Sequence, residues 1–243
     1  MHELPGMTPA CVDFGLRLSE QNFRVHLPLL FGEPLDDRFL KHGRALCVSK
    51  EFACLKAGVS APITDWLRAL ARHLAAEDRS VRVGAIGMCL TGAFVIPMII
   101  EPGVHAGVIS QPAIPLSVSH WLLGLGDGSW KRELNVSDEH LAAAVQCARD
   151  RGKAVLLQRI DGDRLSPPER QHRLAEAFGA QAESLEPYPN QKILRRLFNP
   201  PHALLTQEYA DHREDPDHMT KAAFAKVVAF LREHLNQVSH TNL

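Results

Sequence analysis

Short apolar runs typical of buried strands alternate along this chain with segments whose apolar residues recur at helical spacing. Strands are predicted at residues 23–30, 81–88, 105–114, 153–160 and 181–189. Helices are predicted at residues 62–78, 90–100, 137–152, 166–180 and 217–235. This alternation is typical of a mostly parallel sheet with helices on both faces, so we expect an α/β fold.

Residues at the helix ends agree with this prediction. Ser137 or Asp138 can cap the start of the helix at 137–152, and Gly152 can end it. Pro97 is expected to kink the helix at 90–100. No repeat, linker or low-complexity segment divides the chain, so residues 1–243 are predicted to form a single domain.

Composition excludes several classes of partner. The 27 basic and 28 acidic residues give a net charge of −1, which argues against binding to nucleic acid or to an anionic membrane surface. The apolar runs are much shorter than the roughly 20 residues of a membrane span. The first residues lack the pattern of a secretory signal.

The cysteines favour a reducing compartment. There are five, an odd number, and none forms a CxxC pair. They are Cys11, Cys47, Cys54, Cys89 and Cys147. Neither a disulfide framework nor a zinc cluster is indicated, so we expect free thiols and a cytoplasmic protein. Four of the five are interpreted as small buried hydrophobic residues.

Three residues capable of chemistry follow predicted strands. Cys89 comes after 81–88, Asp163 after 153–160 and His202 after 181–189. Functional groups of a parallel sheet lie at the carboxyl ends of its strands. The chain order of nucleophile, acid and histidine is that of the α/β-hydrolase triad.

The stretch "VRVGAIGMCLTGAF" (81–94) suits a sharp strand-to-helix turn that exposes Cys89. Gly87 and Gly92 supply the small neighbours that such a turn requires. The helix start and a nearby imidazole would favour a thiolate, and the amide of Leu90 would face a developing oxyanion. Cysteine after a strand also occurs in ordinary tight packing, so both interpretations stay open for this stretch alone.

The segment "IGMCLTGAF" resembles the nucleophile turn of the dienelactone hydrolase family, G-x-C-x-G-G. The resemblance extends in order through "HELPGMTP", "LSEQNFRVHLPLLFGEP", "ISQPA", "DGDRLSPPER" and "PHALLT". It implies an α/β-hydrolase fold. It also implies that Cys89 is the nucleophile, that His202 acts as base and then acid, and that Asp163 orients His202.

The same resemblance implies further site residues. Glu3 matches a glutamate that lies beside the cysteine and helps to control its protonation. The amides of Leu4 and Leu90 would form the oxyanion hole. The implied reaction is hydrolysis of a small ester or lactone through a thioester acyl-enzyme, without a metal or organic cofactor.

Some assignments have competitors. Asp161 lies two residues before Asp163, and an aspartate beside glycine often only forms a turn. His212 and His218 compete with His202. Glu3 could be a terminal acid without a role.

Three features depart from the family pattern. Thr91 stands where glycine is usual, so its Cβ is expected to crowd the turn. Pro201 stiffens the loop that delivers His202. The family has strands upstream of the segment at 2–9, so we expect an N-terminally truncated sheet, through a misplaced start or a real loss.

The leading hypothesis is therefore a thiol hydrolase acting on a small ester or lactone. The alternative is a non-catalytic or decayed member that keeps the fold and binds a small molecule or partner. A cysteine peptidase fits the chain order less well. The substrate depends on the loop at 115–137, and no oligomeric state is predicted.

Overall fold

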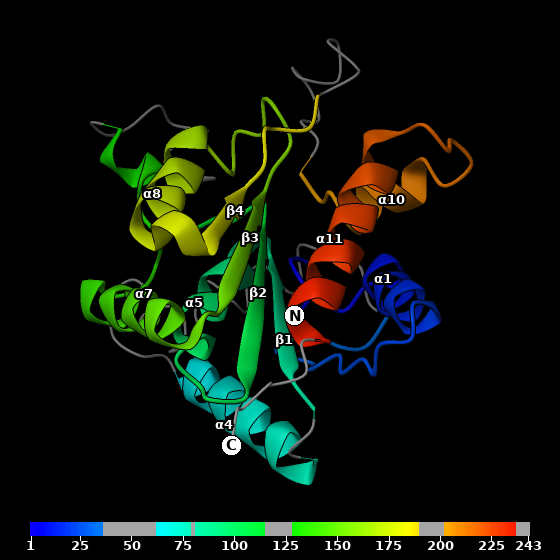
Figure 1. Cartoon of the computed structure of the whole chain (residues 1–243). Helices are drawn as coiled ribbons and strands as arrows, with labels where there is room; N and C mark the ends of the chain where they lie inside the picture. Colours follow the sequence, from blue (N-terminus) through cyan, green and yellow to red (C-terminus); the bar gives the residue numbers. More distant parts are fainter. Residues whose placement is uncertain (36–61, 79–80, 115–127, 190–201, 237–243) are drawn as a thin grey trace.

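The computed structural model describes residues 1–35, 62–78, 81–114, 128–189 and 202–236 (Figure 1). Its sheet has the strand order β1-β2-β3-β4, and each neighbouring pair is parallel. The strands are β1 (Val83–Met88), β2 (Val104–Ser110), β3 (Ala154–Gln158) and β4 (Ala182–Ser184). The predicted parallel sheet is confirmed.

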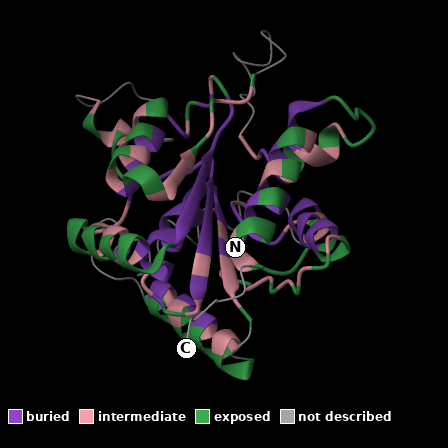
Figure 2. Ribbon diagram, in the orientation of Figure 1, coloured by how far each residue is buried: buried purple, intermediate pink, exposed green. Residues whose placement is uncertain are grey.

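Helices cover both faces of the sheet (Figure 1). One face carries α4 (Pro62–Glu77), α5 (Gly92–Met98), α7 (Asp138–Arg151) and α8 (Pro168–Phe178). The other carries α1 (Pro9–Glu20) and α11 (Met219–Leu235), beside the short α10 (Gln207–Asp211). The strands between these layers are largely buried (Figure 2), so each face has its own apolar core.

The predicted ends of α7 are confirmed. The Ser137 hydroxyl accepts a hydrogen bond from the His140 amide at 3.2 Å. Gly152 ends the helix with a φ of 60°, a conformation that favours glycine. Pro97 lies in the last turn of α5, and the helix ends at Met98 rather than at residue 100.

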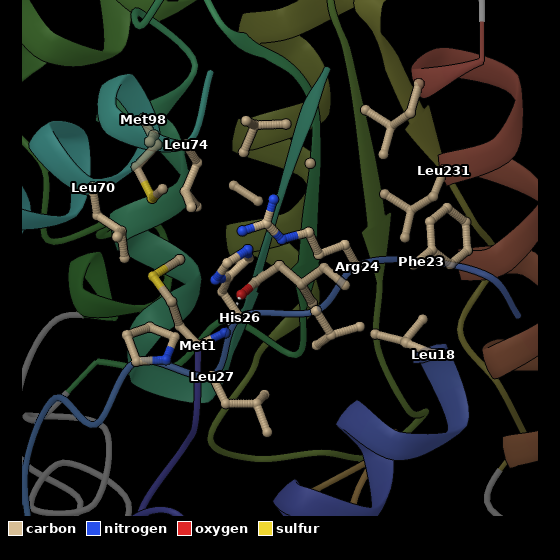
Figure 3. Close-up of a pocket in the computed structure, with 18 of the residues that line it drawn as sticks. Met1, Leu18, Phe23, Arg24, His26, Leu27, Leu70, Leu74, Met98 and Leu231 are labelled. Atoms are coloured by element: carbon tan, nitrogen blue, oxygen red, sulfur yellow. Dashed lines mark hydrogen bonds between the residues drawn. The ribbon is translucent and has the colours of Figure 1, made fainter. Parts of the chain in front are cut away.

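Two of the predicted strands differ from the structure. The strand predicted at 181–189 is regular only in β4, with an isolated parallel bridge between Ile160 and Tyr188 beyond it. The prediction at 23–30 is wrong, because this segment contains no strand. A strand needs a neighbour to complete its ladder, and a cavity separates this segment from β1 (Figure 3).

Helix α1 is absent from the sequence prediction although its start carries a clear signal. The Thr8 hydroxyl accepts a hydrogen bond from the Cys11 amide at 3.2 Å, and Pro9 occupies the first turn. Within the described ranges, no helix is both long and apolar enough to cross a bilayer.

Candidate active site

Cys89 is the first residue after β1 and has an unusual backbone conformation. Its φ is 54°, in the left-handed region that non-glycine residues rarely adopt. A 3-10 turn, η1 (Cys89–Thr91), follows and leads directly into α5. The strand therefore turns sharply into a helix at Cys89, and a strained residue at such a turn is typical of functional sites.

Gly87 permits this turn to close. A Cβ atom at Gly87 would lie 2.7 Å from the carbonyl carbon of Thr91, against its oxygen, and 2.8 Å from Cγ2 of Val95. Gly92 is less constrained, because a Cβ there would lie 3.3 Å from side-chain atoms of Ile109 and Pro112. Both glycines were identified from sequence, but Gly87 carries the stronger steric requirement.

Thr91 is accommodated in the turn rather than excluded from it. Its side chain is fully buried, and its hydroxyl oxygen accepts a hydrogen bond from the Met88 amide at 3.0 Å. The hydroxyl donates toward the Met88 carbonyl at 2.9 Å and also lies 3.3 Å from the Met1 carbonyl. The threonine thus ties the turn to β1 and to the first residue.

Asp163 and His202 form a buried hydrogen-bonded pair. Nδ1 of His202 lies 2.7 Å from Oδ2 of Asp163, whose other oxygen accepts the amides of Leu165 and Ser166 at 2.9 and 3.2 Å. Asp163 is buried, whereas its competitor Asp161 is exposed. Because the Asp163 carboxylate can only accept a hydrogen bond, Nδ1 of His202 carries the proton and Nε2 points away from Asp163.

The Cys89 thiol lies near the imidazole of His202. Burial opposes protonation of the imidazole, but the Asp163 carboxylate and the Cys89 thiol together raise the pKa of His202 well above its ordinary value. Nε2 of His202 is buried and makes no hydrogen bond to any described residue, although the Cys89 thiol lies near enough to contribute to the raised pKa of His202. The structure therefore pairs His202 with Asp163 and places the Cys89 thiol near the same imidazole.

Glu3 lies at the same end of the sheet but contacts other groups. Its carboxylate accepts hydrogen bonds from the Thr206 hydroxyl and, at 3.3 Å, from Nε2 of Gln111. Burial is the main reason that the pKa of Glu3 is raised, although the nearby His202 opposes the shift. Among the described residues, no hydrogen bond joins Glu3 to Cys89.

Sequence reasoning missed a buried polar chain beside Glu3. Nε2 of Gln158 donates to the Ser110 hydroxyl at 3.2 Å, and that hydroxyl donates to Oε1 of Gln111. All three side chains are fully buried, and Gln111 has a φ of 36°. The signal was a pair of polar residues, Ser110 and Gln111, at the end of an apolar strand.

Of the two proposed oxyanion-hole residues, Leu90 lies in the turn and Leu4 lies on the N-terminal segment. Leu90 follows Cys89 in η1, and first-turn amides have no acceptor within their own helix. Leu4 follows Glu3 on the segment that Met1 anchors to Ile86 through a 2.6 Å hydrogen bond. Their role stays a prediction.

The competing histidines occupy another place. His212 and His218 stack on each other with ring centroids 3.9 Å apart, and Nδ1 of His212 lies 2.9 Å from the Glu208 carbonyl. Pro201 and residues 115–127 of the expected substrate loop lie outside the described residues.

One group of side chains has metal-ligand character. Atoms of Glu183, Glu233 and His234 lie within 4.8 Å of one another, at β4 and α11. Lys226 already pairs with Glu183 at 2.6 Å and supplies a positive charge there. We therefore assign no metal to this group.

His2 is buried in its neutral form. Its Nε2 accepts the Leu30 amide at 2.9 Å, and its Nδ1 lies 3.3 Å from the Glu3 carbonyl, to which it donates. Burial is the main reason that the pKa of His2 is lowered to about 4. Protonation would destroy the acceptor that fixes Leu30.

We therefore expect the free energy of unfolding to fall as pH decreases from about 6.5 to about 4. In this range the unfolded chain binds a proton at His2, whereas the folded chain does not. The contribution is about 3 kcal/mol. His2→Gln keeps a neutral acceptor and should remove this component of the acid sensitivity. Urea unfolding of both proteins across this pH range measures their free energies of unfolding. The difference between the two proteins removes the contributions of Glu3 and His202, whose titrations change stability in the opposite direction. Identical pH profiles would contradict the assignment.

Comparison with known proteins gives likenesses of fold. No family model and no curated protein matches the chain. A puromycin hydrolase mutant complexed with PGG is similar over 76% of this chain and 27% of its own, with 18% identity and a TM-score of 0.46. An esterase of Pyrococcus furiosus is similar over 71% of this chain and 62% of its own, with 17% identity and a TM-score of 0.44. The chain thus spans about a quarter of the first protein and less than two thirds of the second.

The fold itself follows from the observed topology. A parallel sheet carries helices on both faces, and its first described strand turns sharply at a cysteine into a helix. Asp163 and His202 follow later strands at the same end of the sheet. This arrangement fits the α/β-hydrolase fold.

Proposed function

We propose that this protein is a dienelactone hydrolase-like enzyme that cleaves a small ester or lactone through a thioester acyl-enzyme. The observation that carries the proposal is the position of Cys89. It occupies a strained turn at a strand end and lies near a histidine that a buried aspartate orients. A nucleophile, a base and an orienting acid in this geometry are the parts required for acyl transfer.

The proposed reaction begins with transfer of the Cys89 proton to Nε2 of His202. The thiolate attacks the carbonyl carbon, and the amides of Leu4 and Leu90 receive the resulting oxyanion. Collapse of this intermediate breaks the carbon–oxygen bond, and Nε2 returns the proton to the leaving alkoxide or enolate. Water then attacks the thioester with His202 as base, which releases the acid and restores the thiol.

Asp163 supports the charged form of His202 in this scheme. Its carboxylate holds the Nδ1 proton and favours the imidazolium that faces the thiolate. Glu3 acts less directly, because Thr206 and Gln111 hold it near His202 rather than against the thiol. We assign Glu3 a positioning role through the loop that carries both Thr206 and His202.

Asp163→Asn should lower kcat/KM about 100-fold or more, since the amide cannot stabilise the imidazolium. Removal of this charge should also lower the pKa of His202, so the alkaline limb of the rate profile moves to lower pH. Asp161→Asn is the matched control and should leave both quantities unchanged. Equal effects of the two substitutions would contradict the role of Asp163.

The direct test is a trapped acyl-enzyme. The protein is mixed with p-nitrophenyl acetate, quenched in acid and analysed by intact mass and peptide mapping. We expect one acetyl group on Cys89 that hydroxylamine removes. Turnover without a Cys89 adduct would overturn the thioester mechanism, and absence of both would favour the non-catalytic alternative.

A further inference from the structure

Arg170 is a buried cation at the start of α8. It lies in the first turn of this helix, and its side chain is 1% exposed. A helix start carries a partial positive charge, so neither the helix nor the burial favours an arginine at this position. Burial lowers the pKa of Arg170 to about 10, so the guanidinium keeps its charge at neutral pH. The groups around the side chain must therefore stabilise it.

Four main-chain carbonyls surround the guanidinium. Nε donates to the Glu133 carbonyl at 2.6 Å, and Nη2 donates to the Trp130 carbonyl at 2.9 Å. Nη1 donates to the carbonyls of Pro112 and Leu165 at 3.1 and 2.9 Å. A guanidinium has five N–H groups. At least four of them thus have acceptors, which come from three separate segments of the chain.

The Pro112 carbonyl leads from Arg170 to the turn of Cys89. Pro112 and Ala113 share one peptide group, and the Ala113 amide donates to the Cys89 carbonyl at 3.1 Å. Arg170 therefore binds the oxygen of a peptide group whose nitrogen binds Cys89. Cys89 has the strained φ of 54°, and such a conformation persists only where surrounding contacts hold it.

The Leu165 carbonyl leads from the same nitrogen of Arg170 to Asp163. The Leu165 amide donates to Oδ1 of Asp163 at 2.9 Å, while the Leu165 carbonyl accepts from Nη1. Asp163 in turn orients His202. Nη1 thus binds both the segment that holds Cys89 and the segment that holds Asp163. Arg170 connects the two halves of the candidate site through two short hydrogen-bonded paths.

We propose that Arg170 is a positioning residue that fixes the turn of Cys89 relative to Asp163 and His202. The inference rests on the proposed reaction, in which the thiol transfers its proton to the imidazole. A lysine would keep the charge, but its ammonium is a single point and cannot reach carbonyls that a guanidinium binds through three nitrogens. The planar shape of the side chain, rather than its charge alone, is therefore the property required at this position.

An effect of charge is the alternative that the test must separate. Asp163 and Cys89 lie near enough to the guanidinium to favour its charged form. A positive charge at this distance would also favour the thiolate of Cys89. An effect of charge alone requires only a cation at residue 170, whereas positioning requires the guanidinium.

Arg170→Lys makes this distinction. We expect kcat/KM for p-nitrophenyl acetate to fall about 100-fold, the loss expected for a displacement of about 1 Å between reacting groups. With the thiol displaced from the imidazole, the pH midpoint of Cys89 alkylation by iodoacetamide should move toward about 8.5, the value of a free thiol. Exchange of the Ala113 and Leu165 amides should become at least about 10-fold faster, because both segments lose the support of Arg170.

Lys153→Met is the matched control. Lys153 is likewise 1% exposed, and its Nζ donates to the carbonyls of Ile99 and Glu101 at 2.6 and 2.7 Å. It lies directly before β3, at the opposite end of the sheet from Cys89. Loss of this cation leaves buried carbonyls without a donor, so Tm should fall. We expect kcat/KM and the alkylation midpoint to stay unchanged.

Arg170→Ala provides a second test, which also applies if the lysine variant does not fold. Guanidinium chloride at a non-denaturing concentration should restore the fold and the alkylation midpoint of Arg170→Ala, because the free ion can bind the same carbonyls. Methylammonium chloride at equal concentration supplies the charge without the planar shape and should restore neither.

Other outcomes overturn the inference. Unchanged kinetics and alkylation in Arg170→Lys, or equal rescue by methylammonium, would show that charge suffices. An equal loss of kcat/KM in Lys153→Met would assign the effect to general destabilisation. Absence of ester turnover in the wild-type protein would contradict the proposed function alone. The alkylation midpoint and amide exchange of Arg170→Lys would then decide whether Arg170 positions Cys89, and unchanged values would overturn that role.

Discussion

Cys89→Ala should reduce ester hydrolysis to the uncatalysed background, a loss of at least ~1000-fold in kcat/KM. The substitution removes the only atom that forms the covalent bond in the proposed reaction, and His202 and Asp163 cannot replace it. Alanine lacks only the sulfur, so the buried turn should keep its fold. Steady-state hydrolysis of p-nitrophenyl acetate measures the loss, and circular dichroism verifies that the variant is folded.

Cys147→Ala is the matched control. Cys147 is a partly exposed free thiol on α7, whose sulfur lies 3.5 Å from the Ile99 carbonyl rather than near a histidine. We expect full activity in this variant. Sub-stoichiometric iodoacetamide at neutral pH should likewise alkylate Cys89 at least about 10-fold faster than Cys147. Equal losses in both alanine variants, or equal alkylation of both thiols, would contradict a special role for Cys89.

The residues that the structure brings together were predictable because topology constrains them. Parallel strands place their carboxyl ends at one edge, so Cys89, Asp163 and His202 had to converge once their strands were recognised. The choice between Asp161 and Asp163 was harder, because it depends on burial. Only Asp163 turns inward, where the amides of Leu165 and Ser166 hold its carboxylate.

Contacts between distant segments were not predictable from local pattern. Residues 23–30 have strand-like composition, but a strand depends on a partner across space, and here a cavity occupies that place. The hydrogen bonds of Glu3 with Thr206 and Gln111 join three remote segments. No spacing within any one of those segments indicates this network.

Gly87→Ala should impair activity and stability together. The added Cβ would meet the Thr91 carbonyl, a backbone group that cannot rotate away, and Cγ2 of Val95 at 2.8 Å. Overpacking of this kind costs about 1–3 kcal/mol or more. Relief requires the turn to open, and displacement of a reacting group by about 1 Å can cost roughly 100-fold in rate. Thermal unfolding and kcat/KM for the same ester measure the two effects.

Gly92→Ala separates the geometry of the turn from the general effect of a methyl group. Its Cβ would lie 3.3 Å from side-chain atoms of Ile109 and Pro112 and 3.4 Å from the Pro112 Cα, contacts that a shift of a few tenths of an ångström relieves. The loss in rate should therefore be much smaller than for Gly87→Ala. If the two variants behaved alike, the close approach of Gly87 to Thr91 would not control the position of Cys89. A loss of kcat/KM in Gly87→Ala alone would instead link the strained conformation of Cys89 to its reactivity. The substitution alters the turn but removes none of the proposed catalytic side chains.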